Sequence, residues 1–464
     1  MTAVTTSRAA LAEIRALLWL AAPIIIAQLS HTAIGFVDTV MAGRVSPSDL
    51  AAVALGNSIW VPILLFMNGV LLATTPKVAQ LFGAENTDAV GPLVRQALWL
   101  AAAVGLIATA TLWNAEPVLH LMKVDPELVP MAMGYLQATA VGFPAVAFYH
   151  VLRCMSDGLG RTRPSMYIGL GGLALNIPLN YIFIYGKLGL PAMGGVGCGW
   201  ASAVSMWFML LAMLAWVKMG PYYQPYKFFS QFSRPNFHEI KRLISIGLPI
   251  GIAIFAEVSI FSVIALLIGS LGAATVAGHQ IALNISSLIF MVPFSLGLAV
   301  TVRVGQALGR GDPVHARFAA LVGISCALAF AFISATGMMI WREALVGIYT
   351  TDPLVIAIAT SLIIYAALFQ FSDGIQVCAA GALRGFQDTR VTMIFTLFSY
   401  WGVGLPVGYA LGISDWLGEP SGPKGLWEGL IAGLTCAAIL LGARLHFTAR
   451  RHIHLANSPK AKHA

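Results

Sequence analysis

The sequence has 464 residues, of which 58% are hydrophobic and only 10% are charged, and its formal net charge is +8 at pH 7. Because a soluble domain carries about 25% charged residues, so few charges cannot cover a water-exposed surface, and a soluble globular protein is excluded. Disorder is excluded as well, since disordered chains combine low hydrophobicity with high charge. The composition indicates a protein that crosses a membrane many times.

Apolar segments recur along the chain at the length that a bilayer requires. A spanning helix needs about 20 predominantly apolar residues, and this window predicts an all-α membrane protein with twelve transmembrane helices. The predicted spans cover residues 16–43, 51–76, 95–117, 128–152, 164–186, 195–217, 243–270, 276–302, 318–341, 353–381, 391–412 and 425–443.

One connection between predicted spans is longer than the others. Residues 218–242 are rich in Pro, Tyr, Phe and basic side chains, and they separate six spans from six spans. We therefore expect an N-lobe at residues 1–217, a cytoplasmic linker at 218–242 and a C-lobe at 243–464.

The basic residues alternate between the two sides of the predicted membrane protein. With the N-terminus inside, 22 of the 27 Lys and Arg residues fall on the inner side, as the positive-inside rule describes. The five on the outer side are Arg44, Lys123, Lys187, Arg342 and Lys424. We expect a multi-pass protein of the bacterial inner membrane with both termini in the cytoplasm. No A-x-A-like cleavage site closes a short apolar core, so the first span is expected to stay uncleaved.

The two halves of the sequence resemble one another at a shift of 226 residues. Pro23 falls on Pro249 and Gln80 on Gln306, and positions 23–83 contain 16 identities in 61. Because six spans is an even number, both copies enter the membrane from the same side, and the pseudo-twofold axis of such a parallel repeat lies along the membrane normal. Two six-helix bundles related in this way are expected to leave a cleft for a transported substrate.

Missing motifs exclude other classes of protein. The five cysteines form no C-x-x-C pair, so neither a disulfide framework nor a metal knuckle is expected. The chain contains no G-x-x-x-x-G-K-[ST], H-E-x-x-H or G-x-S-x-G motif. We expect no enzymatic activity and no cofactor. Energy for transport is expected to come from an ion gradient or from a partner. Basic loops facing anionic lipid explain the net charge without a nucleic-acid partner.

Three acidic residues fall inside predicted spans, namely Asp38, Glu257 and Asp373. An ionised side chain at the centre of a bilayer helix costs roughly 2.5–3.5 kcal/mol on insertion scales, and no Lys or Arg is expected at comparable depth. We therefore expect these carboxyls to face an interior or wet cavity and to be neutralised by protons or bound cations. The structural alternative is a set of neutral acids that hydrogen-bond neighbouring helices.

The repeat indicates that the two halves do not carry the same titratable groups, so the site at which an ion drives transport is expected to be asymmetric. At the shift of 226, Glu257 falls on His31, while Asp38 falls on Ile264. His31 is either a second protonatable group or a histidine that packs between helices.

Pairs of side-chain amides accompany the acids. Asn176 and Asn180 lie four residues apart and project from one helix face. Their oxygens either complete a cation pocket with Asp38 or hydrogen-bond a neighbouring helix. Gln280 and Asn284 repeat the spacing, and the same two readings apply.

Five stretches of sequence carry a resemblance to a known family. They are GFVDTVMAG at residues 35–43, NIPLNY at 176–181, GHQIA at 278–282, QFSD at 370–373 and ALRG at 382–385. Together and in this order they resemble the multidrug and toxic compound extrusion (MATE) family, most closely its NorM branch. The resemblance implies a secondary antiporter, working as a monomer in the lipid bilayer. It implies export of cationic amphipathic drugs and dyes, such as fluoroquinolones, in exchange for H+ or Na+.

The resemblance also implies roles for single residues. It implies that Asp38 with Asn176 and Asn180 forms an ion-coupling site in the N-lobe, and that Glu257 with Asp373 forms one in the C-lobe. If the ion is Na+, its metal ligands are expected to be Asp38, Glu257 and Asp373. The implied substrate contacts are Gln280, Asp352, Asp373 and Glu257.

One departure from the family pattern favours protons over sodium. Four residues before the C-lobe aspartate, NorM-like relatives with a sodium site can carry tyrosine, whereas this sequence has Phe369 and lacks that oxygen. An alternative function is a lipid-linked saccharide flippase of the same superfamily, whose anionic substrate favours Arg or Lys in the cavity. A membrane-embedded enzyme is disfavoured because no nucleophile–base or metal constellation occurs.

Overall fold

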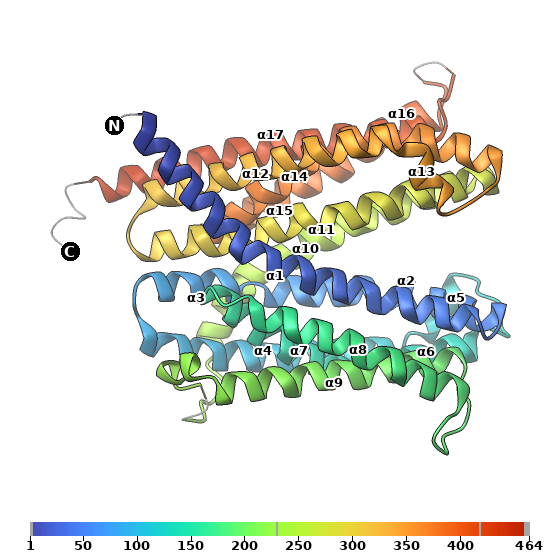
Figure 1. The fold of residues 1–464 in the computed structure, drawn as a ribbon, viewed down its shortest axis with the longest axis horizontal. Coiled ribbons are helices and arrows are strands. Elements are labelled where there is room, and N and C mark those ends of the chain that lie inside the picture. Colours follow the sequence, from blue (N-terminus) through green and yellow to red (C-terminus); the bar gives the residue numbers. More distant parts are fainter. Residues whose placement is uncertain (1–2, 229–230, 417–418, 459–464) are drawn as a thin grey trace. The chain divides into compact units, whose positions relative to one another are not determined.

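The computed structural model describes residues 3–228, 231–416 and 419–458. Throughout this part of the chain the regular secondary structure is helical and no strand occurs (Figure 1), which confirms the predicted all-α fold. Phe229 and Ser230 of the predicted linker, and Lys460 and Lys462 among the predicted inner-side basic residues, lie outside the described residues.

The helices follow one another with mostly short connections. The first half contains α1 (Ala3–Gly43), α2 (Pro47–Leu71), α3 (Thr74–Gly83), α4 (Thr87–Trp113), α5 (Glu116–Leu121), α6 (Val129–Ala140), α7 (Phe143–Gly158), α8 (Arg163–Tyr185), α9 (Gly195–Met219) and the 3-10 helix η1 (Pro221–Tyr226). The second half contains α10 (Phe237–Gly269), α11 (Ala273–Gly309), α12 (Pro313–Ile340), α13 (Arg342–Gly347), α14 (Pro353–Gly385), α15 (Thr389–Leu397), the π-helix η2 (Phe398–Gly404), α16 (Leu405–Gly412) and α17 (Pro423–Ala456). The short helices α5 and α13 are related by the same shift of 226 residues as the sequence halves.

The number of membrane spans agrees with the prediction. Within the described residues, eleven helical segments are long and apolar enough to cross a membrane, and α6 with α7 makes a twelfth span that is bent by 42°. Some helices are longer than the predicted spans: α17 continues to Ala456, whereas the predicted last span ends at residue 443. Hydropathy marks only the apolar part of a helix, so its polar end is missed.

The chain divides into two compact units. The N-unit is Ala22–Gly251, and the C-unit is Met1–Ala21 together with Ile252–Ala464. This division differs from the expected boundaries, since residues 1–21 group with the second half of the chain and residues 218–251 with the first. Helices α1 and α10 therefore contribute to both units. Pro23 and Pro249 lie within three residues of the two divisions, where each removes a backbone N–H from its helix.

A buried ion-paired cluster holds the beginning of α1 in the C-unit. The two carboxylate oxygens of Glu13 accept hydrogen bonds from Arg303 of α11 at 2.7 and 2.5 Å, and His315 of α12 lies 3.2 Å from the same carboxylate. A buried carboxylate is costly unless it is paired and hydrogen-bonded. These contacts therefore account for the grouping of the first helical residues with the C-unit.

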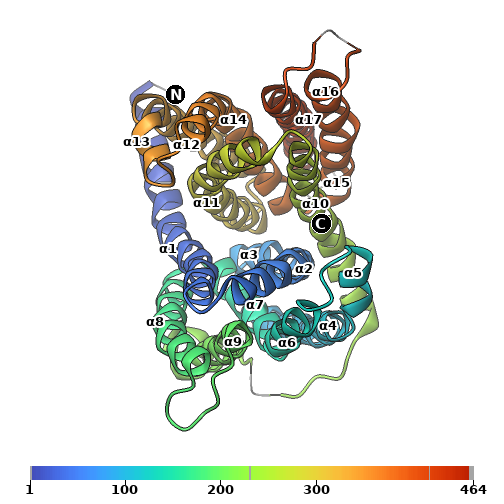
Figure 2. The same ribbon diagram turned by 90° about the vertical axis from the view of Figure 1, so that its right-hand side faces the viewer.

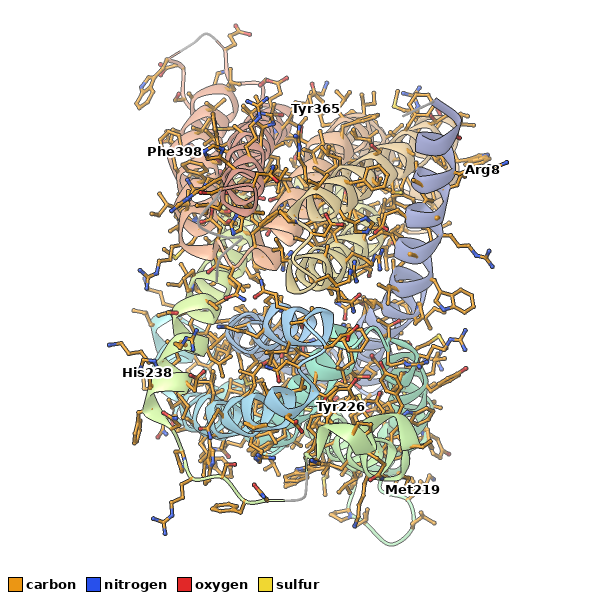
Figure 3. The ribbon with its side chains drawn as sticks, turned by 90° about the vertical axis from the view of Figure 1, so that its left-hand side faces the viewer. Arg8, Met219, Tyr226, His238, Tyr365 and Phe398 are labelled. Carbon is orange, nitrogen blue, oxygen red and sulfur yellow. The ribbon has the colours of Figure 1, made fainter. Side chains whose placement is uncertain are left out.

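The connection between α9 and α10 is anchored to the N-unit. Figure 3 labels Met219 at the end of α9, Tyr226 at the end of η1 and His238 near the start of α10. Tyr223 of η1 is buried, with its hydroxyl 2.6 Å from the Ser156 hydroxyl of α7. Burial raises the pKa of Tyr223 above its ordinary value, so this hydroxyl stays protonated and available as a donor.

The same connection then follows α4 (Figure 2). Arg95 donates to the Ser233 hydroxyl at 2.6 Å, and the Trp99 indole donates to the Ser233 carbonyl at 2.9 Å. Gln96 donates to the carbonyl of Arg234 at 3.1 Å. These contacts explain why the predicted linker belongs to the N-unit.

Two spans of the N-unit are interrupted where their counterparts in the C-unit are continuous. The chain bends between α6 and α7 at Gly142, and Pro144 follows in the first turn of α7. Between α2 and α3, Pro76 lacks the N–H that would bond to the carbonyl of Leu72. At the shift of 226, Pro76 falls on Val302, and α11 runs through this position unbroken.

Helix α14 is the central helix of the C-unit, where it packs against α11, α12 and α17. A Cβ atom on Gly381 of α14 would clash with the carbonyl of Gly297 on α11. A Cβ on Gly429 of α17 would likewise clash with the backbone of Gly408 on α16. Small residues permit such close helix packing in membrane proteins. This packing buries the polar face of α14 that carries the acidic site.

Candidate functional site

Asp38 lies in the interior of the N-unit, where its side chain is held by uncharged donors. The residue is 1% exposed. Its Oδ1 accepts a hydrogen bond from Asn180 Nδ2 of α8 at 2.6 Å, and its Oδ2 accepts one from the Ser202 hydroxyl of α9 at 2.7 Å. Figure 2 shows α1, α8 and α9 side by side at this place. The carboxylate is thus hydrogen-bonded, but neither donor neutralises its charge.

The two predicted amides of α8 share the face that meets Asp38. Asn180 Nδ2 also donates to Asn176 Oδ1 at 2.9 Å, and both side chains are fully buried. Asn176 Nδ2 and Asn180 Oδ1 have no hydrogen-bond partner among the described residues. An unsatisfied buried polar group costs about 1–3 kcal/mol. The free N–H donor of Asn176 suits a water molecule, and the free oxygen of Asn180 suits a water molecule or a small cation.

A second group of polar side chains lies beside Asp38. The Tyr135 hydroxyl of α6 donates to Asn57 Oδ1 of α2 at 2.8 Å, and the Trp60 indole donates to the same oxygen at 2.8 Å. Tyr135 is completely buried and interacts electrostatically with Asp38. The Cys198 thiol of α9 lies 3.5 Å from the Asp38 carbonyl. These contacts connect α2, α6 and α9 to the Asp38 turn of α1.

Glu257 and Asp373 come together in the C-unit. Glu257 Oε1 of α10 accepts a hydrogen bond from Gln376 Nε2 of α14 at 3.3 Å. Gln376 lies three residues after Asp373, on the same face of α14, and contacts both carboxyls. Asp373 is 1% exposed, and its Oδ2 has no hydrogen-bond partner among the described residues. Adjacent carboxylates repel one another strongly in a low-dielectric interior, so a proton or a cation is needed between them.

Tyr400 approaches the same carboxyls from the π-helix η2. It is 1% exposed and interacts electrostatically with Glu257 and Asp373. The hydroxyls of Tyr400 and Ser399 lack a well-aligned hydrogen-bond partner in the described chain. The Trp401 indole donates to the carbonyl of Ala256 at 3.2 Å and thereby fixes η2 against α10. Single π-turns within helices occur frequently at functional sites.

The three acids have no basic ion-pair partner. In the described ranges, no Lys or Arg nitrogen lies within 4.0 Å of the carboxylates of Asp38, Glu257 or Asp373. Two arginines are buried near helix ends, which the sequence did not indicate. Arg153 of α7 pairs with Asp157 at 3.5 Å, and Arg384 of α14 acts on Glu257 only from beyond ion-pair distance.

The remaining predicted substrate contacts are Gln280 of α11 and Asp352 at the start of α14. Gln280 and Asn284 share an exposed face of α11, with 3.4 Å between their side-chain polar atoms. Asp352 caps the N-terminus of α14, accepting hydrogen bonds from the backbone N–H of Leu354 and Val355. It precedes Asp373 by 21 residues, which corresponds to about 30 Å along a helix. The structure therefore does not bring Asp352 to the Asp373 site, and the carboxylate of Asp352 caps the helix instead.

The sequence left two roles open for His31 and singled out Phe369. The ring of His31 packs against Tyr149 with 6.2 Å between ring centroids, and its Nε2 atom has no partner within the described ranges. Phe369 lies one turn before Asp373, buried between Phe261 and Trp427 at centroid distances of 6.1 and 6.2 Å. Phe369 therefore offers no oxygen ligand at this turn.

Three residues of the candidate site were missed from sequence. Gln376 could have been found, because it lies one turn from Asp373 on a helix. Ser202 carried no local signal, since it is 164 residues from Asp38 along the chain. Tyr400 lies in an apolar segment whose π-helical geometry the sequence does not indicate.

Side chains that commonly hold metal ions are not clustered in the described parts of the chain. In residues 3–228, 231–416 and 419–458, no three or more such side chains are grouped as a metal ion would require. Buried carboxyls without resident counter-charges instead suit small cations that come and go. Together with the many spans, they define the class of protein as a helical membrane transporter.

Comparison with known proteins identifies the family. A family model described as MatE matches residues 23–182 and again 249–410, and the two matches begin at the two prolines of the internal repeat. The chain is 62% identical over 443 residues to multidrug resistance protein PmpM of Pseudomonas aeruginosa, covering 95% of this chain and 93% of the relative. It is 47% identical over 443 residues to probable multidrug resistance protein NorM of Shewanella oneidensis, covering 96% of each.

The fold agrees with solved structures of the same kind. A crystal structure of MATE in the bent conformation has a TM-score of 0.88 at 20% identity, covering 96% of this chain and 97% of that chain. The chain belongs to the MATE family. The resemblance noted in the sequence is confirmed, and the protein is a transporter rather than an enzyme.

Proposed function

We propose that this protein exports cationic amphipathic drugs and dyes, fluoroquinolones among them, in exchange for protons. The observation that carries the proposal is that Asp38 and Asp373 are buried, Glu257 is half-buried, and none of the three has a basic ion-pair partner in the described chain. Relatives named as multidrug resistance proteins support drugs as the substrates. A drug cation and an inward-moving proton would then compete for the same negative charges, and each would displace the other.

Protons are favoured over sodium as the coupling ion. Sodium requires several oxygen ligands, by analogy with other hard cations, and the turn before Asp373 presents the buried ring of Phe369. A proton requires only one oxygen. We place the protein in the bacterial inner membrane as a monomer, with both termini in the cytoplasm. The saccharide flippase is not favoured, because the relatives are named as multidrug resistance proteins.

Purified protein in liposomes tests the proposal directly. Ethidium transport should follow an imposed pH gradient, and an imposed sodium gradient alone should not drive it. Asp38→Asn, Glu257→Gln and Asp373→Asn should each reduce pH-driven transport at least tenfold while the protein still inserts into the membrane. Asp125→Asn, in an exposed loop, is the matched carboxyl-to-amide control. Wild-type transport by all three buried-site variants would refute the proposal.

A further inference from the structure

A second group of buried polar atoms lies in the N-unit, apart from Asp38. It comprises His31 of α1, Asn68 of α2, and Tyr149 and His150 of α7. Four of their atoms have no hydrogen-bond partner among the described residues, namely His31 Nε2, Asn68 Oδ1, Tyr149 Oη and His150 Nε2. These residues come from three helices of the N-unit.

His31, Tyr149 and His150 are neighbours, and Asn68 meets His150 through its backbone. The rings of His31 and Tyr149 lie 6.2 Å apart between centroids, and the ring of His150 interacts both with His31 and with the backbone of Asn68. The charged group that faces both histidines is Arg153 of α7. Arg153 pairs with Asp157 at 3.5 Å, and Tyr149 faces both members of this ion pair.

Four unsatisfied polar atoms in one place are expensive, at about 1–3 kcal/mol each. Buried water molecules relieve this cost, since each typically makes about three hydrogen bonds to otherwise unsatisfied groups. Two imidazoles, a phenol and an amide oxygen supply the donors and acceptors that a short chain of water molecules requires. The arrangement therefore fits bound water better than a dry, packed core.

Open space lies beside α1 between His31 and Asp38. His31 precedes Asp38 by seven residues, which is about two helical turns or roughly 10 Å along α1, so the two side chains share a face. Gly35 lies between them on that face, and a Cβ atom built on Gly35 meets no heavy atom within 4 Å. The glycine thus leaves open space between the two polar groups.

We propose that His31 and His150 relay protons between Asp38 and the end of α7 that carries Arg153 and Asp157. An imidazole that accepts a proton on one ring nitrogen releases the proton of the other nitrogen. A proton leaving Asp38 passes through water beside Gly35 to His31, then to His150, and finally to water at that end of the helix. Each ring returns to its neutral form, and no proton is gained or lost on the way.

The relay rests on the proposed proton coupling, and one measurement separates the two. Binding of tetraphenylphosphonium to the detergent-purified protein is followed with a pH-indicator dye in a stopped-flow instrument. The wild type should release protons on binding. His31→Gln and His150→Gln should slow this release at least tenfold, while the Kd for tetraphenylphosphonium stays within twofold. Wild-type release rates in both variants overturn the relay alone. Drug binding without proton release by the wild type overturns the coupling and the relay together.

Substitutions at Gly35 test the route without touching either histidine. Gly35→Leu should fill the open space and slow proton release as strongly as His31→Gln, whereas the smaller Gly35→Ala should retain most of the rate. In His31→Ala, added imidazole should restore part of the lost rate, which a purely structural role for the ring does not predict. A normal rate in Gly35→Leu, or no imidazole effect, contradicts the relay.

Discussion

The side-chain nitrogen of Asn180 donates at once to Asp38, at 2.6 Å, and to Asn176, at 2.9 Å. One amide of α8 therefore orients two oxygen atoms, one on α1 and one on its own helix. The hydroxyl of Ser202 is a second donor to Asp38, and Asn176 interacts with the same carboxyl. Neutral groups therefore hold the buried carboxylate in position.

Replacing Asn180 by leucine should disable transport through Asp38. The substitution removes the shortest bond to the carboxylate and leaves a buried acceptor unsatisfied, at a cost of about 1–3 kcal/mol. We expect ethidium efflux from energised cells to fall at least tenfold, with membrane expression monitored by immunoblot. Asn114→Leu, at the exposed end of α4, should retain efflux. Undiminished efflux in Asn180→Leu would show that the amide does not position Asp38.

Removing the Tyr400 hydroxyl should separate transport from stability. The hydroxyl is buried without a well-aligned partner in the described chain, so Tyr400→Phe should leave the thermal stability in detergent unchanged or higher. Transport should decrease, since the hydroxyl is the polar group that η2 presents to Glu257 and Asp373. Tyr409→Phe on the exposed side of α16 should affect neither quantity. Equal transport by the Tyr400 variant and the wild type argues against a role in the C-unit site.

Neutralising Glu13 should loosen the beginning of α1 from the C-unit. Hydrogen bonds to charged groups contribute about 1.5–3 kcal/mol each, and Glu13→Gln weakens two of them and leaves Arg303 without its counter-charge. We expect a lower unfolding temperature in detergent, measured by intrinsic tryptophan fluorescence. Glu116→Gln, whose partner His120 is exposed, serves as the comparison and should change the unfolding temperature little. If Glu13→Gln and Arg303→Gln destabilise additively in a double-mutant cycle, the pair is not coupled.

Two substitutions at Asp352 distinguish a helix cap from a substrate contact. Asparagine is as good a cap as aspartate, whereas alanine loses about 1 kcal/mol. We therefore expect Asp352→Asn to behave as the wild type and Asp352→Ala to lower stability, with unchanged drug affinity in both. Weaker drug binding by Asp352→Asn at unchanged stability would instead support the substrate contact that the family resemblance implies.

Much of the candidate site could be predicted from the sequences of single helices. Asp38, Glu257 and Asp373 stood out because charged side chains are rare in apolar spans, and the shared face of Asn176 and Asn180 followed from their spacing. The capping bonds of Asp352 were not predicted, since they depend on where α14 begins.

The grouping of residues 1–21 with the C-unit could not be predicted from hydropathy. It rests on the contact of Glu13 with Arg303, which are 290 residues apart in sequence, and nothing local to either residue encodes the other. The same holds for the bend between α6 and α7, because prolines in membrane helices occur both in bent and in continuous segments, as Pro178 in the unbroken α8 illustrates.

By itself, the sequence determined that this is a helical protein of twelve spans with three acids inside them, because hydropathy and residue spacing are properties of single segments. The tertiary structure alone decided which groups surround each acid. Whether a buried charge meets a neutral donor, another carboxyl or an arginine depends on side chains brought together from distant parts of the chain. The side chains around each acid set the free-energy cost of leaving its charge without a proton or a cation.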